Sequence, residues 1–164
     1  AALWQLPVLF VCENNYYAMG TALARSEAET DLVAKAGSYH MHATTVDGMD
    51  VLAVERTAHD IIEQVRATKA PAFLEARTYR LRAHSMYDPQ LYRSREEVQE
   101  WERHGPLTTL TTQLKAQGLM TEEDFVELRR AAVAEVDAAV AFAEAAPLEA
   151  VSDLERFVYA EARP

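Results

Sequence analysis

The sequence predicts an α/β fold with a parallel sheet, followed by C-terminal helices. Two stretches, residues 8–12 and 72–79, have the composition of buried strands, and a helix-forming segment at 57–69 precedes the second. Helices cover both faces of a parallel sheet, so its strands tend to be apolar along their length instead of alternating. Strands that alternate with helices in this way are typical of parallel α/β sheets.

The first half of the chain supplies these elements in order. An irregular loop through Gly20 follows the first strand, and residues 26–36 have helical composition with a stop at Gly37. A short strand is expected over residues 42–46. The dipeptide Asp47-Gly48 then signals a turn.

The segment between that turn and the last strand predicts one convincing helix. Residues 51–54 either begin this helix or lead into it. Its apolar side is formed by Ile61, Ile62 and Val65. Pro71 ends the helix, and the strand at 72–79 follows.

The second half of the chain is predicted to be helical after a loop without periodicity at 81–94. The expected helices are 96–103, 106–118 and 121–146. Thr121 and Asp124 approximate a capping box at the start of the longest helix. One face of it carries small and apolar residues at helical spacing: Phe125, Leu128, Ala132, Val136, Ala139 and Ala143. The apolar residues of the tail, 152–161, are numerous enough to dock.

Composition narrows the possible functions. The 164 residues carry a formal net charge of −10, which disfavours binding to the nucleic-acid backbone. No apolar run approaches the roughly 20 residues needed to span a bilayer, so no membrane partner is expected. The single cysteine, Cys12, cannot form an internal disulfide and fits a buried structural role. A reducing compartment is expected, either a bacterial cytoplasm or a mitochondrial matrix.

The most informative local feature is the polar cluster that ends the first strand. Glu13, Asn14 and Asn15 follow the apolar run directly. Ligands of open α/β sheets bind beyond the carboxyl ends of the strands. Carboxylate and carboxamide groups there can bind a hard cation or a polar ligand. The alternative is a simple Asx turn after the strand.

The stretch 6–21, LPVLFVCENNYYAMGT, resembles the second half of the thiamine-diphosphate motif, and the whole chain resembles one protein family. This family is the alpha subunit of the thiamine-dependent first component of 2-oxo acid dehydrogenase complexes. The resemblance extends through VDGMD (46–50), TYRLRAHSMYDP (78–89) and YRSREE (92–97) to about the end of the long helix. This series argues against a transketolase-like enzyme.

The resemblance implies a partial thiamine-diphosphate-binding fold. The first half of the motif, Gly-Asp-Gly, is absent from the 164 residues. We therefore expect the chain to be the C-terminal part of a longer subunit, with a metal-binding aspartate upstream. Residues 1–105 would complete the cofactor-binding domain, and residues 106–164 would form a helical extension packed on it.

The resemblance also assigns site residues. Asn15 would bind Mg²⁺ through its side-chain oxygen and Tyr17 through its main-chain oxygen, while His84 would line the cofactor pocket and act in catalysis. The alternative for His84 is a residue that only braces its loop. Ser85 corresponds to a phosphorylated serine of mitochondrial relatives, but Leu91 departs from a second such position. We expect Asn15 and His84 to converge at one rim of the sheet.

Four arginines make the segment from 80 to 95 basic: Arg80, Arg82, Arg93 and Arg95. They are expected either to order the loop, with Asp88 as an internal partner, or to be solvated at the surface. The other histidines, His40, His42, His59 and His104, lack a motif and are expected to be solvated or structural.

The function that the resemblance implies is oxidative decarboxylation of a 2-oxo acid, with transfer of the acyl unit to a lipoyl group. The cofactors would be thiamine diphosphate and Mg²⁺. The partners would be the beta subunit of an α₂β₂ enzyme and a lipoyl-bearing acyltransferase. ENNYYAMGT and HSMYDP are closer to the pyruvate and acetoin members than to the branched-chain ones, which favours pyruvate. The isolated chain is expected to be inactive, and the alternative function is an assembly module that uses the helix face of residues 125–143.

Overall fold

The computed structural model describes residues 1–160. The chain forms two compact units, Ala1–Leu119 and a second one that starts at Met120. The domain boundary expected after residue 105, and the packing of the C-terminal extension on the first domain, stay predictions. Residues 161–164, which end the expected extension and the expected tail, lie outside the described part.

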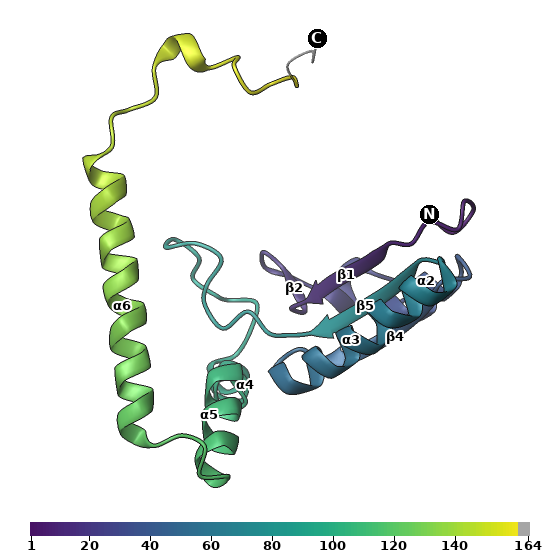
Figure 1. Cartoon of the computed structure of the whole chain (residues 1–164), viewed down its shortest axis with the longest axis horizontal. Coiled ribbons are helices and arrows are strands. Elements are labelled where there is room, and N and C mark those ends of the chain that lie inside the picture. Colours follow the sequence, from purple (N-terminus) through teal and green to yellow (C-terminus); the bar gives the residue numbers. More distant parts are fainter. Residues whose placement is uncertain (161–164) are drawn as a thin grey trace. The chain divides into compact units, whose positions relative to one another are not determined.

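The first unit is built on the predicted parallel sheet (Figure 1). Its strands are β1 (Leu9–Asn14), β4 (His42–Asp47) and β5 (Ala72–Arg77), in the order β1-β5-β4, and both pairs are parallel. The register places Asn14 and Asp47 on either side of Arg77. The carboxyl ends of all three strands therefore meet at one edge, and the predicted fold class is confirmed.

The hydrophobic core lies between the sheet and one long helix, α3 (Val51–Thr68). Its buried side chains alternate along the strands and recur along one side of the helix: Val46, Ile61, Val65, Ala72, Leu74 and Ala76. Alternate residues of β5 point to the opposite face of the sheet. There, Phe73 of β5 and Ala36 of helix α2 (Leu32–Gly37) line an apolar pocket. Helices thus cover both faces, as a parallel sheet requires.

The prediction of one helix over residues 26–36 is wrong. The chain forms a short helix α1 (Leu23–Ser26), an extended segment, and then α2. The side chain of Asp31 accepts a hydrogen bond from the backbone N–H of Ala34, 3.0 Å away, and so caps a helix that begins only at Leu32. The composition favoured a helix, but the cap set where it begins.

Helix α3 begins at Val51, six residues before the convincing part of the predicted helix. The reason is Asp50, whose carboxylate accepts hydrogen bonds from the backbone N–H groups of Leu52 and Ala53. Residues 51–54 therefore begin the helix. At its other end, Lys69 adopts a left-handed conformation at φ 55°, which closes the helix before Pro71.

The remaining elements match the predicted ones within a few residues. They are α4 (Arg95–Arg103), α5 (Pro106–Ala116), α6 (Glu122–Ala145) and a turn of 3₁₀ helix, η1 (Val151–Asp153). Thr121 and Asp124 form the predicted capping box. Within the described residues the apolar tail side chains Leu154 and Phe157 are exposed. None of the helices found there is long and apolar enough to cross a membrane.

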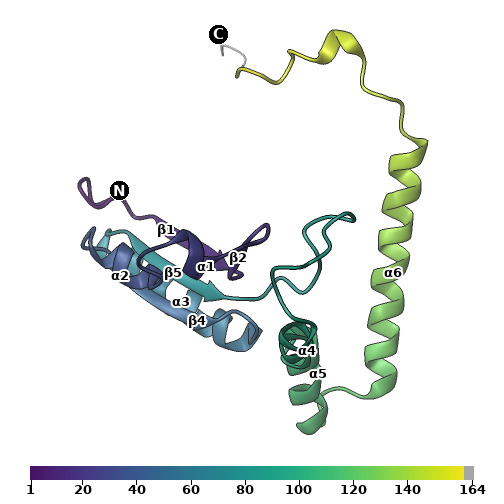
Figure 2. The ribbon, with the colours of Figure 1, turned by 180° about the vertical axis from the view of Figure 1, so that it is seen from behind.

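A small hairpin after β1 was not predicted. Strands β2 (Tyr17–Ala18) and β3 (Thr21–Ala22) pair antiparallel within the expected irregular loop. This hairpin lies beside the end of β1 in both views of the molecule (Figures 1 and 2). It matters because it carries one of the predicted metal ligands.

Candidate functional site

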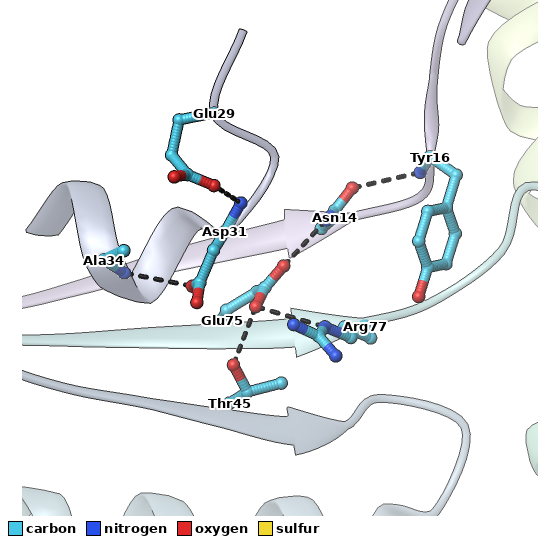
Figure 3. Close-up of polar contacts among 8 residues, drawn as sticks. All are labelled: Asn14, Tyr16, Glu29, Asp31, Ala34, Thr45, Glu75 and Arg77. Atoms are coloured by element: carbon cyan, nitrogen blue, oxygen red, sulfur yellow. Dashed lines mark hydrogen bonds and ion pairs between the residues drawn. The ribbon is translucent and has the colours of Figure 1, made fainter. Parts of the chain in front are cut away.

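The carboxyl edge of the sheet is organised around one buried carboxylate, Glu75 of β5. This side chain is fully buried and joins the three strands (Figure 3). Oε1 accepts a hydrogen bond of 2.7 Å from Asn14 Nδ2 on β1. Oε2 accepts one of 2.7 Å from Thr45 Oγ1 on β4 and a charge-assisted one of 3.2 Å from Arg77 Nε. No local pattern in the sequence predicts this network.

The network fixes the predicted polar cluster. Strand β1 extends two residues beyond the predicted end at residue 12, so Glu13 and Asn14 belong to the strand and only Asn15 follows it. Asn14 is only 8% exposed, and its Oδ1 accepts a hydrogen bond of 3.1 Å from the N–H of Tyr16. Asn15 Oδ1 accepts a hydrogen bond of 3.3 Å from the N–H of Tyr17. Two successive Asx turns therefore follow the strand, and Tyr16 takes up a left-handed conformation at φ 66°. The turn considered as an alternative for Asn15 is present.

His84 is exposed and lies in the loop between β5 and α4. Its backbone N–H donates to Asp88 Oδ2 over 2.9 Å, and its ring Nδ1 lies 3.5 Å from Arg80 Nη1. Arg93 donates to the backbone carbonyl oxygens of Arg80 and Leu81. Side chains of this loop thus order it from within. Asp88 takes part by accepting hydrogen bonds from the Tyr92 hydroxyl and from the backbone N–H groups of His84 and Gln90, not as the arginine partner that was expected.

The loop of His84 is tied to the hairpin that carries Tyr17. Arg80 Nη2 donates to the carbonyl oxygen of Met19 and, over 2.8 Å, to Tyr92 Oη. A Cβ added at Gly20 would lie only 2.9 Å from the ring of Tyr92, so loop and hairpin are in close contact there. The segment of Asn15 and the loop of His84 therefore meet at one edge of the sheet. That both side chains converge on a single pocket stays a prediction.

Ser85 is exposed beside His84, and its carbonyl oxygen accepts a hydrogen bond of 3.2 Å from the N–H of Asp88. The other histidines are exposed, as expected: His40, His42, His59 and His104.

The Cys12 thiol has a raised pKa because it is partly buried, with smaller contributions from the carboxylates of Glu75 and Glu13. Cys12 is thus only partly buried, not the buried residue that was expected.

Asp88 provides a prediction on pH. Hydrogen bonds from the Tyr92 hydroxyl and from the N–H groups of His84 and Gln90 lower its pKa from the ordinary 3.8 to about 2. A carboxyl group with a lowered pKa stabilises the folded loop above its unfolded-state pKa and loses that effect as the pH falls through the folded value. We expect the contribution of Asp88 to loop stability to be lost between about pH 4 and pH 2, while the hydrogen bonds of Arg80 and Arg93 remain.

The measurement is the carboxyl ¹³C shift of Asp88 followed by NMR between these pH values. The Tyr92→Phe variant should bring the Asp88 pKa back toward its ordinary value, because the hydrogen bond that lowers it most is lost. An unchanged midpoint in this variant would contradict the explanation.

A cavity of about 630 Å³ opens beyond the ends of β4 and β5. Its lining includes Thr45 and Arg77 of the Glu75 network, together with Tyr16, Asp47 and Trp101. Asn15 and His84 are not among its lining residues. Residues 1–160 contain no group of three or more His, Cys, Asp or Glu side chains that could hold a metal ion. A metal ion bound by Asn15 would therefore need further ligands that do not come from such a cluster of His, Cys, Asp or Glu side chains.

The family profile described as "Dehydrogenase E1 component" matches residues 1–152 of the chain. The chain belongs to the dehydrogenase E1 component family. This confirms the family resemblance that was carried by residues 6–21, 46–50 and 78–97. Several members of this family are similar to this chain over most of the chain's length.

Three such relatives are named as E1 alpha subunits of pyruvate dehydrogenase. The subunit alpha of Zymomonas mobilis is 48% identical over 155 residues, and that of Rhizobium meliloti is 41% identical over the same number. Both matches cover 94% of this chain and 44% of the relative. The mitochondrial type I alpha subunit of Ascaris suum is 47% identical over 142 residues, which cover 85% of this chain and 35% of that protein. The chain thus spans less than half the length of these E1 relatives.

Proposed function

We propose that this chain works as part of the alpha subunit of a thiamine-diphosphate-dependent 2-oxo acid dehydrogenase, with pyruvate as the substrate. The observation that carries the proposal is the meeting of the Asn15 turn and the His84 loop at the carboxyl edge of a parallel sheet. Open α/β sheets bind their ligands at this edge. Relatives named as pyruvate dehydrogenase E1 alpha subunits support the choice of substrate.

The donor groups present fit a Mg²⁺ ion that is shared with a diphosphate. Mg²⁺ prefers octahedral oxygen coordination and is commonly bound by few protein groups together with phosphate oxygens. A carboxamide oxygen has two lone pairs, so Asn15 Oδ1 can bind a cation while it accepts the hydrogen bond from Tyr17. The carbonyl oxygen of Tyr17 would be the second ligand, and an aspartate outside these 164 residues the third.

His84 would act at the reacting end of this site. An imidazole can donate or accept a proton near neutral pH. The Arg80 guanidinium lies 3.5 Å from Nδ1, at the limit of a hydrogen bond to the ring. When bound, thiamine diphosphate supplies the electron-accepting group that permits loss of CO₂. The chain itself holds the diphosphate end, positions His84 and keeps the loop ordered.

The proposed partners are a beta subunit, which completes the α₂β₂ enzyme and the cofactor site, and a lipoyl-bearing acyltransferase that accepts the acyl unit. The relatives named above come from bacteria and from a mitochondrial source. We therefore propose a bacterial cytoplasm or a mitochondrial matrix as the location. Ser85, exposed beside His84, is the proposed site of regulatory phosphorylation, since an added phosphate would repel the cofactor diphosphate.

The proposal predicts that Asn15→Ala weakens Mg²⁺-dependent binding of thiamine diphosphate about tenfold or more, because one oxygen ligand is lost. The measurement is calorimetric titration of the complete alpha subunit assembled with its beta subunit. Gln64→Ala is the matched control, since it removes an exposed carboxamide from α3. Equal affinities for the Asn15→Ala and wild-type enzymes would remove Asn15 from the site.

The second candidate is an assembly module without catalytic competence of its own. Helix α6 favours it, because it exposes apolar side chains along much of its length, including Leu128, Val133, Val136, Val140 and Phe142. Assembly with a partner, but no cofactor response in any mixture, would support this role. Pyruvate decarboxylation by the purified chain alone would contradict the expectation that it is inactive in isolation.

A further inference from the structure

Glu97 of helix α4 binds two tyrosine hydroxyls from different parts of the chain. Its Oε1 accepts a hydrogen bond of 2.8 Å from Tyr17 Oη on the hairpin. The same oxygen accepts one of 2.8 Å from Tyr79 Oη, two residues beyond the end of β5. One carboxylate oxygen therefore joins the hairpin, the end of the central strand and α4.

Aromatic and cationic neighbours pack against this junction. The Tyr79 ring is stacked on Trp101, with centroids 5.0 Å apart and an interplanar angle of 6°. The Arg93 guanidinium lies 5.4 Å from the centre of the Tyr79 ring. Tyr79 is only 6% exposed, and Glu97 is half-buried. A partly buried, charge-assisted hydrogen bond of this kind is stronger than a neutral one and holds its donor in a defined place.

The part of Tyr17 that matters for the proposed site is its backbone. The Tyr17 N–H donates to Asn15 Oδ1, and its carbonyl is the proposed second Mg²⁺ ligand. Holding the Tyr17 side chain by its far end restricts rotation of this residue and of the turn before it. The side chain is also packed against the ring of Tyr92, whose centroid lies 5.3 Å from its own.

We propose that Glu97 is a positioning residue for the Mg²⁺ site, acting through the hydroxyl of Tyr17 on the two oxygens contributed by Asn15 and Tyr17. This inference rests on the proposed function. Residues that orient metal ligands from behind typically change metal affinity about 10–100-fold when they are replaced. Glu97 does not contact the metal itself in this proposal.

The test uses the complete alpha subunit assembled with its beta subunit. Binding of thiamine diphosphate is measured calorimetrically over a range of Mg²⁺ concentrations, and amide hydrogen exchange is followed at residues 16–18. Glu97→Ala should raise the Mg²⁺ concentration for half-maximal binding about tenfold and speed exchange at these amides. Tyr17→Phe, which removes only the hydroxyl, should raise it by a smaller factor, about threefold.

Glu96→Ala is the matched control, because Glu96 is the exposed neighbour in the first turn of the same helix. Its Mg²⁺ dependence should equal that of the wild type. A purely structural role for Glu97 would lower the melting temperature and leave the Mg²⁺ midpoint unchanged. If Glu97→Ala fails to fold, Tyr17→Phe decides the question by itself.

The two proposals fail in different ways. Cofactor binding by the wild type, with Mg²⁺ midpoints in Glu97→Ala and Tyr17→Phe equal to that of Glu96→Ala, overturns the role of Glu97 alone. A wild-type enzyme that binds no thiamine diphosphate at any Mg²⁺ concentration overturns the proposed function, and this inference with it.

Discussion

Replacing Glu75 by leucine is expected to lower the free energy of unfolding by about 3–5 kcal/mol, as is typical when one partner of a buried charged network is removed. Asn14 Nδ2 and Thr45 Oγ1 would lose their acceptor, and Asn14 has little access to water. Each buried polar group left without a partner costs about 1–3 kcal/mol. Arg77 Nε would lose its acceptor as well. The added apolar contact of leucine cannot replace the three hydrogen bonds that Glu75 accepts.

The measurement is denaturant unfolding of the chain, followed by circular dichroism. Glu75→Gln should lose less stability than Glu75→Leu, because glutamine keeps one acceptor oxygen. It should still be less stable than the wild type, because its N–H₂ group would face the donor groups that the second carboxylate oxygen now accepts from. Glu55→Leu is the control on the exposed side of α3, where a change within about 0.5 kcal/mol is expected. A loss of less than about 1 kcal/mol in Glu75→Leu would show that the network contributes little to stability.

The Glu75 network also shows what the sequence could not predict. The residues joined to Glu75 are 61 positions away in the case of Asn14 and 30 in the case of Thr45. Their meeting depends on the parallel register of three strands, which no local pattern encodes. The capping box of Thr121 and Asp124, by contrast, spans three residues and was predicted correctly. This local cap was predictable, but locality alone was not enough, because the equally local cap of Asp31 on Ala34 was missed. The contacts set by the register were not predictable at all.

The same distinction applies to the candidate site. Asn15 and Tyr17 follow a strand, so their place at the edge of the sheet follows from the apolar run before them. The tie between this turn and the loop of His84 depends on Arg80 donating to a backbone carbonyl, that of Met19. Any residue type supplies such an acceptor, so the contact has no sequence signature. The family resemblance predicts that these residues share one site. The predicted sheet explains the position of Asn15 and Tyr17, but it does not explain the contact with the loop of His84.

The turn Asp47-Gly48 was predicted from its dipeptide, but the structure gives Gly48 a second requirement. Its N–H donates to the carbonyl oxygen of Arg77 over 2.7 Å, so two backbones are in close contact here. A Cβ at Gly48 would lie 2.5 Å from Thr78 Cγ2 and 2.8 Å from the Arg77 oxygen. Because the second contact is with backbone, rotation of a side chain cannot relieve it.

Gly48→Ala is therefore expected to destabilise the chain by about 2–3 kcal/mol, the upper part of the usual cost of forcing extra atoms into a well-packed place. The ends of β4 and β5 would have to separate, so chemical shifts of residues 46–48 and 76–78 should move as well. Gly37→Ala is the matched control, because a Cβ there meets nothing within 4 Å at the end of α2. It should be neutral or stabilising by up to about 1 kcal/mol, since alanine favours the helix over glycine. Equal unfolding midpoints for the two variants would mean that the sheet edge yields to the extra carbon, and that glycine at position 48 serves only the turn.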